Sequence, residues 1–124
     1  MPTLLILDDS EDLLTLRSAL FCSVGFKVIP CADPWKALAV LSASQIDIVV
    51  TDYDMPEMDG LSFAERARAM GYGGPIIMST GSLMIPGHAR QWISQIVDKA
   101  SPPQALLHAV RAYSGFPTSD SDEN

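Results

Sequence analysis

The stretch "VVTDYDMPEMDG", residues 49–60, places acidic side chains directly after a run of apolar and β-branched residues. Asp52 ends the apolar run, and Asp54 and Asp59 follow it closely. Like charges at the end of a buried strand repel one another and are costly to remove from water. A bound cation is the simplest compensation, so the stretch indicates a cation site.

Other chemically capable residues follow other apolar runs. Asp8 and Asp9 end the first run of the chain, Thr80 ends a later one, and Lys99 ends the last. Carboxylates without histidine or cysteine suit Mg²⁺ better than Zn²⁺. If these groups meet Asp52, they make a phosphoryl site: a carboxylate attacks, the metal and the lysine neutralise the oxygens, and the hydroxyl donates to one of them.

The apolar runs alternate with segments of helical periodicity. Short apolar runs predict strands at residues 3–7, 26–31, 46–51, 75–80 and 94–99. Apolar spacings and capping signals predict helices at about 10–24, 33–42, 61–70 and from 101 onward. Strand and helix that alternate in this way predict an α/β fold, with a parallel sheet covered by helices on both faces.

Details of the runs suggest the strand order. Pro30 cannot donate to a strand ladder, so the second strand should lie at a sheet edge. The third run is almost continuously apolar and should be central. Right-handed crossovers then favour a doubly wound, flavodoxin-like (βα)5 sheet of order 2-1-3-4-5. In the first helix, we expect the buried face to carry Leu13, Leu16, Leu20 and Val24.

This order brings the acidic residues together. Ligands of such sheets bind beyond the carboxyl ends of the strands, at the switch point between the first and third strands. Asp8 and Asp9 lie at the end of the first strand, and Asp52 lies at the end of the third. The acidic stretch is therefore expected to be part of a pocket assembled from distant segments.

Bulk composition limits the function classes. The chain has 124 residues and a net charge of -7, which suits one domain and argues against direct nucleic-acid binding. It contains neither an apolar run near the roughly 18 residues that span a bilayer nor a basic, apolar leader. We therefore expect a cytoplasmic protein without a membrane partner. Cys22 and Cys31 are expected to be thiols, with a disulfide as the alternative.

Taken together, these motifs resemble the receiver domains of two-component response regulators over nearly the whole chain. The matching residues are Asp8-Asp9, "DYDMPEMDG", Thr80 and Lys99. The resemblance implies that Asp52 is the phosphoacceptor and receives its phosphoryl group from a histidine kinase or a histidine phosphotransfer protein. It also implies that Asp9 and Asp52 bind Mg²⁺ directly and that Asp8 binds it largely through water. The backbone carbonyl of Asp54 would be a further Mg²⁺ ligand. Thr80 and Lys99 would contact the phosphoryl oxygens.

The chain departs from the family pattern in its last third. Ala100 follows Lys99 where the family usually has a proline behind a cis bond, so we expect a trans bond. Ile96 stands where an aromatic switch residue is usual. The interval before Lys99 is short for the family and contains Pro86-Gly87, which predicts a short or irregular fourth helix. Asp54 adds an acid beside the phosphoacceptor.

We interpret residues 1–115 as a stand-alone receiver domain and 116–124 as an acidic, disordered tail. It would act by Mg²⁺-dependent phosphorylation that controls partner binding or onward phosphotransfer, without turnover as an enzyme. One alternative is a phosphorylation-independent pseudo-receiver. The altered fourth helix favours it, whereas the complete set of Asp8, Asp9, Asp52, Thr80 and Lys99 argues against it. Another is an aspartyl-phosphate phosphatase of the haloacid-dehalogenase type. In those enzymes the paired acids lie on the first strand and a threonine follows, whereas here they follow the third strand and Pro56 takes that place.

Overall fold

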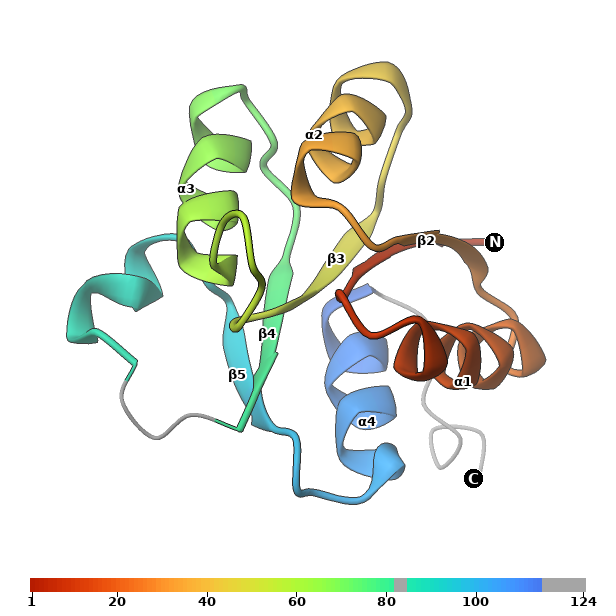
Figure 1. Cartoon of the computed structure of the whole chain (residues 1–124). Coiled ribbons are helices and arrows are strands. Elements are labelled where there is room, and N and C mark those ends of the chain that lie inside the picture. The colour runs from red at the N-terminus through yellow and green to blue at the C-terminus, as the bar shows by residue number, and fades with distance from the viewer. Residues whose placement is uncertain (82–84, 115–124) are drawn as a thin grey trace.

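The computed structural model describes residues 1–81 and 85–114 (Figure 1). One parallel sheet contains five strands in the order β2-β1-β3-β4-β5: β1 (Thr3–Leu7), β2 (Lys27–Cys31), β3 (Ile48–Asp52), β4 (Ile76–Thr80) and β5 (Gln95–Asp98). The helices between and after the strands are α1 (Glu11–Ser23), α2 (Pro34–Ala43), α3 (Gly60–Ala69), the 3-10 helix η1 (Gly87–Gln91) and α4 (Pro103–Ser114). The predicted fold class and strand order are confirmed.

Helices cover both faces of the sheet (Figure 1). On one face, α2 and α3 contribute Ala37 and Phe63 to a core that includes Leu5 and Val49 from the strands. On the other face, α1 and α4 contribute Leu14, Phe21, Leu106 and Val110 to a second core with Ile6 and Val50. Because neighbouring residues of each strand point to opposite faces, β1 and β3 supply both cores and are buried almost throughout.

The predicted places of the second and third strands are confirmed. β2 lies at the edge, where Pro30 is exposed and its missing N–H costs no inner ladder bond. β3 lies in the middle, and all of its residues are buried. The sheet therefore ends a central, fully buried strand at Asp52, as the sequence predicts.

Local capping fixes where the helices begin. The Ser10 side chain accepts from the Leu13 N–H, that of Asp33 from the Trp35 N–H, and that of Asp59 from the Ser62 N–H. These bonds satisfy N–H groups that the first turn of a helix leaves without partners. The Ser10 and Asp59 caps matter for the site, because each starts the helix that follows a strand end with acids.

The predicted buried face of α1 is wrong. Leu16 is 68% exposed, and the buried residues of α1 are Leu14 and Phe21. Phe21 lies in the core between α1 and the sheet, and its ring packs edge-on against Phe26, with 5.7 Å between ring centroids. The spacing of Leu13, Leu16 and Leu20 is genuinely helical, but these residues lie along a groove at the side of the helix instead of under it.

The connection between β4 and β5 is short and irregular. Residues 85–93 contain only η1, so the prediction that they lack a long regular helix is confirmed, while 82–84 lie outside the described residues. The Lys99–Ala100 bond is trans, as expected. Cys22 and Cys31 are free thiols. The predicted tail, 116–124, also lies outside the described part of the chain.

Candidate phosphorylation site

The residues singled out in the sequence converge at one edge of the sheet. Asp8 directly follows β1, Asp52 and Thr80 are the last residues of β3 and β4, and Lys99 follows β5. The carboxyl ends of parallel strands share one edge, so the topology alone brings these side chains together. The backbone supports the arrangement, since the Lys99 N–H donates to the Thr80 carbonyl at 2.9 Å.

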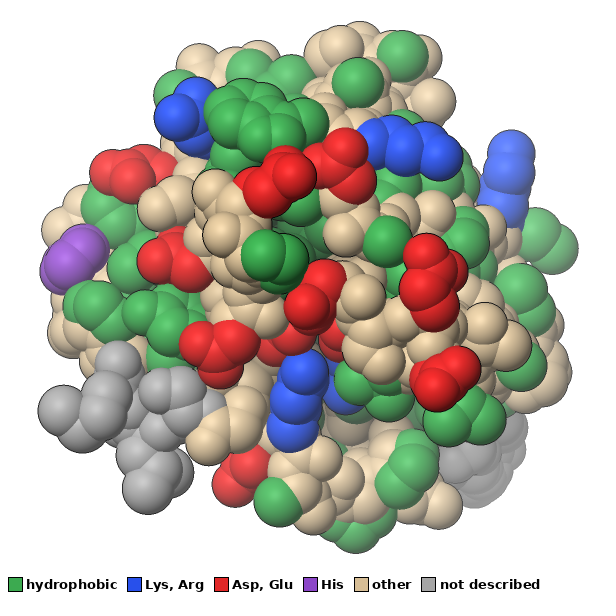
Figure 2. Space-filling view, viewed as in Figure 1, with side chains coloured by type: hydrophobic (Ala, Val, Ile, Leu, Met, Phe, Trp, Pro, Cys, Tyr) green, Lys and Arg blue, Asp and Glu red, His purple; other side chains and the backbone are tan. Residues whose placement is uncertain are grey.

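Three carboxylates form the centre of the site. One oxygen from each of Asp8, Asp9 and Asp52 lies within 4.8 Å of the others. Asp8 and Asp52 are buried and Asp9 is exposed, so the cluster opens to solvent on the Asp9 side. Figure 2 shows acidic side chains gathered around the middle of this face, with a basic side chain directly beside them. The predicted convergence of the acids is therefore present in the structure.

Lys99 is the nearest basic partner of the acids. Its Nζ lies 3.0 Å from Asp52 Oδ2 and 3.7 Å from Asp8 Oδ2. The side chain is 30% exposed, so it lies at the mouth of the site rather than beneath it. One ammonium group thus contacts two carboxylates and offsets part of their mutual repulsion.

The Asp52 carboxylate is held in an environment that disfavours its charge. Burial raises the pKa of Asp52 above its ordinary value, the hydrogen bond from Lys99 lowers it again, and the charge of Asp8 adds to the rise. Asp52 Oδ1 is buried and has no hydrogen-bond partner among the described residues. The site therefore contains one carboxylate oxygen that Lys99 holds and a second with no protein donor.

These residues fit a divalent cation that prefers oxygen ligands. Three carboxylates lie within coordination range of one another, and the buried Asp52 Oδ1 lacks a protein donor. No histidine or cysteine joins the cluster among the described residues, which suits Mg²⁺ better than Zn²⁺. Asp8 is less available than its neighbours. Its Oδ1 accepts from the Ser10 N–H at 2.9 Å, and its Oδ2 faces Lys99.

Thr80 borders a pocket between the end of β4 and residues 85–90. The residue is 3% exposed and lines a pocket of about 440 Å³ together with Ile96, residues 85–87, Arg90 and Asp98. Ile96 is half-buried and packs against the core that α2 and α3 cover. The pocket lies between the end of β4 and the irregular segment before β5.

The loop after β3 is tied down at both ends. The Gly60 N–H donates to the Tyr53 carbonyl at 2.8 Å, and Asp59 caps α3. Asp54 is exposed and belongs to this loop, two residues after Asp52. The predicted metal contact of the Asp54 carbonyl stays a prediction, as do the chemical roles of the other site residues.

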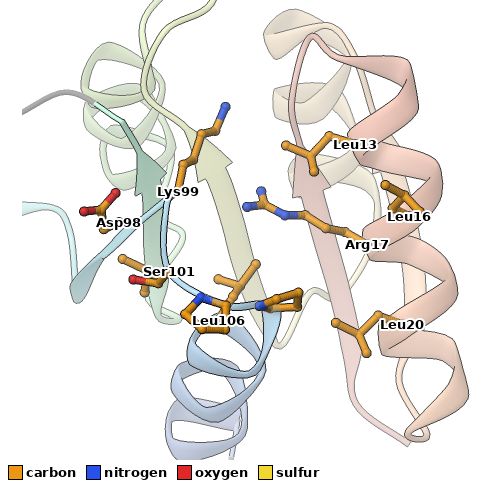
Figure 3. A pocket seen from close by; sticks show the side chains of 11 residues that line it. Leu13, Leu16, Arg17, Leu20, Asp98, Lys99, Ser101 and Leu106 are labelled. Carbon is orange, nitrogen blue, oxygen red and sulfur yellow. The ribbon is translucent and has the colours of Figure 1, made fainter.

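The sequence reasoning missed Arg17. This residue points from α1 toward the strands, on the side where Lys99 lies (Figure 3). Its Nη2 donates to Ser79 Oγ at 2.9 Å, and its Nη1 lies 3.7 Å from Asp8 Oδ2. Leu14, Arg17 and Phe21 are spaced by three and four, so Arg17 lies on the buried face of α1. A reading anchored on Phe21 would have found it.

Comparison with known proteins agrees with the geometry. The family model of the response regulator receiver domain matches residues 4–111. The transcriptional regulatory protein GlrR of Escherichia coli (strain K12) is 29% identical over 110 residues, a match that covers 86% of this chain and 25% of GlrR. The chain thus spans about a quarter of the length of this relative.

Solved structures share the fold over nearly the whole chain. Chemotaxis protein CheY4 of Vibrio cholerae has a TM-score of 0.81 at 25% identity, covering 91% of this chain and 98% of CheY4. Response regulator TrrA of Thermotoga maritima, in complex with Mg²⁺-BeF, has a TM-score of 0.84 at 21% identity, covering 91% of this chain and 99% of TrrA. Within its described residues, our chain has no helix with the length and apolar character needed to cross a bilayer.

Proposed function

Because this chain belongs to the response regulator receiver domain family, we propose that it accepts a phosphoryl group on Asp52. The observation that carries the proposal is the position of this carboxylate. It is buried at the end of the central strand, 3.0 Å from Lys99, with two further carboxylates in reach. A carboxylate that served only packing or capping would not need this combination of an ammonium and two acids.

The reaction we propose is a displacement at phosphorus. One carboxylate oxygen of Asp52 attacks the phosphorus atom of a phosphohistidine, a P–O bond forms, and the P–N bond breaks. The electron pair of that bond stays on the imidazole nitrogen of the donor. The product is an acyl phosphate on Asp52. Its formation requires the ionised carboxylate, which Lys99 favours against the cost of burial.

Asp9 and Asp52 would hold Mg²⁺ directly, with the Asp54 carbonyl as a third protein ligand and Asp8 acting largely through water. When bound, the metal neutralises negative charge on the phosphoryl oxygens during transfer. This assignment is supported by the oxygen cluster of the three acids. TrrA, which shares the fold, was solved in complex with Mg²⁺-BeF.

Lys99 and Thr80 would hold the transferred group. The Lys99 ammonium already contacts Asp52 Oδ2 and can move to a phosphoryl oxygen, because nearly a third of its side chain is solvent-exposed. The Thr80 hydroxyl would donate to another phosphoryl oxygen. A hydrogen bond to a charged group is worth roughly 1.5–3 kcal/mol, so this contact would help to stabilise the phosphorylated state.

The phosphorylation signal would leave the site through the segment before β5. Ile96 has no ring to swing into the space near Thr80, so backbone movement around η1 would carry the change. We propose a histidine kinase or histidine phosphotransfer protein as the donor, and partner binding or onward transfer as the output. Residues 1–115 would form the receiver, acting in the cytoplasm as a phosphoacceptor without turnover.

The proposal is tested by intact-mass measurement after incubation with Mg²⁺ and a small phosphodonor. We expect one phosphoryl adduct per wild-type chain, little adduct without Mg²⁺, and none in Asp52→Asn. Glu57→Gln is the matched control, because it removes an exposed carboxylate from the same loop at a residue without a proposed role in the site. Undiminished adduct in Asp52→Asn, or no adduct in the wild type, would contradict the proposal. The second of these results would favour a phosphorylation-independent interaction module.

A further inference from the structure

Arg17 is a basic residue in a position that otherwise belongs to the core. It lies one turn after Leu14 and one turn before Phe21, both of which are buried under α1. Its side chain is only 14% exposed. The groove on its outer side, about 340 Å³, is lined largely by apolar residues that include Leu13, Leu20 and Leu106 (Figure 3). A buried guanidinium in such surroundings needs compensating partners.

The partners of Arg17 tie it to the acidic cluster. Nη2 donates to Ser79 Oγ at 2.9 Å, which fixes the guanidinium against β4. Nη1 is buried, has no hydrogen-bond partner among the described residues, and faces Asp8 Oδ2 at 3.7 Å. The charges of Asp8 and Asp52 both favour the protonated guanidinium, against the effect of burial, which lowers the pKa of Arg17. The guanidinium is therefore an inner counter-ion of the same carboxylates that Lys99 contacts from the outside.

We propose that Arg17 is a positioning residue of the phosphorylation site: a built-in cation that stabilises the metal-free acidic pocket and weakens its affinity for Mg²⁺. This inference rests on the proposed Mg²⁺ site. Lys99 is 30% exposed and would move to the phosphoryl group, whereas Arg17 is 14% exposed and bonded to Ser79, so it would stay. Its charge therefore acts on the pocket in every state of the cycle.

The sign of the effect follows from charge and geometry. Without Arg17 the carboxylates keep one cation instead of two, so a divalent ion is attracted more strongly. Asp8 keeps its place without Arg17, because its Oδ1 accepts from the Ser10 N–H and its Oδ2 still faces Lys99. The loss of Arg17 is thus an electrostatic change at a carboxylate that stays where it is.

The test is Mg²⁺ titration by calorimetry on the full chain. Arg17→Met keeps an unbranched side chain at a core-facing position but removes the charge, and we expect Mg²⁺ to bind on the order of tenfold more tightly. Arg17→Lys keeps the charge, so its affinity should stay within about threefold of the wild type. Lys27→Met is the matched control. It removes one positive charge from the amino end of β2, whereas the site lies at the carboxyl ends of the strands.

The outcomes separate this inference from the proposed function. If Mg²⁺ binds the wild type, but Arg17→Met binds it no more tightly than Lys27→Met does, the inference is overturned while the metal site stands. If the wild type binds no Mg²⁺, the proposed metal site fails and the inference fails with it. Should Arg17→Met not fold, the guanidinium signals of Arg17 in the wild-type NMR spectrum decide. They should shift along the same binding curve as the Asp9 amide, and unmoved signals would overturn the proposal.

Discussion

Replacement of Gly60 by alanine should damage the site through the backbone that carries it. A Cβ at Gly60 would overlap the carbonyl oxygen of Asp52, and would lie 3.0 Å from its carbonyl carbon and 3.1 Å from Tyr53 Cα. These are backbone atoms, so no side chain can turn aside. The first turn of α3 and the end of β3 would have to separate by about 1 Å to reach ordinary contact distances.

Two magnitudes follow from this separation. Overpacking of a well-packed contact costs typically about 1–3 kcal/mol of unfolding free energy. A displacement of about 1 Å at a reacting group can slow the reaction by roughly 10²-fold. We therefore expect Gly60→Ala to lose stability in chemical denaturation and to accept phosphoryl groups from a small phosphodonor far more slowly than the wild type.

The matched control for this substitution is Gly73→Ala. A Cβ at Gly73 would meet nothing within 4 Å, so this variant should keep wild-type stability and rate. If Gly60→Ala is as stable as Gly73→Ala and is phosphorylated at a similar rate, then the close packing of Gly60 against the Asp52 backbone does not position the site. The account of how the fold positions Asp52 would then be wrong.

Three further predictions concern the charges and the hydroxyl of the site. Burial raises the pKa of Asp52 above its ordinary 3.8, so the folded state binds its proton more tightly than the unfolded state. Metal-free wild-type protein should therefore lose stability relative to Asp52→Asn as the pH rises from 3.8 through the raised pKa; equal pH profiles in thermal unfolding would contradict this. Mg²⁺ should raise the melting temperature of the wild type but raise it less in Asp9→Ala, and equal increments would exclude Asp9 as a ligand. Thr80→Ala should shorten the lifetime of the phosphorylated state, while Ile96→Val should leave partner binding nearly unchanged. Phosphorylation should cause large amide shifts around η1, and shifts confined to the neighbours of Ile96 would refute the proposed transmission through the segment before β5.

The fold and the acidic cluster were predictable because both depend on strong local signals. Each strand is a short apolar run, and each acid stands at the point where a run ends. Parallel topology then collects all the strand ends at one edge, whatever the details of packing. The short, irregular fourth helix was also predictable from a local signal, because Pro86 removes a backbone donor that a helix needs.

The rotation of α1 was not predictable from leucine spacing. The sequence of α1 has two faces with helical spacing of apolar residues. The face with Leu14 and Phe21 is buried, although the other face has more leucines. The larger ring buries more apolar surface and joins a core with strand residues such as Ile6 and Val50, which the spacing within one helix does not reveal. Arg17 was missed as a direct consequence, because it lies on the buried face. The burial of an arginine becomes visible only when Asp8 and Ser79 are in place around it.

The central claim is that Asp52, and no other acid of the cluster, becomes phosphorylated. Borohydride reduces an aspartyl phosphate to homoserine and leaves free carboxylates unchanged, so peptide mass mapping after reduction identifies the acceptor. We predict homoserine at position 52 alone, in wild-type protein treated with phosphodonor and Mg²⁺. Homoserine at Asp8, Asp9 or Asp54, or none in protein that has gained a phosphoryl group, would contradict the account.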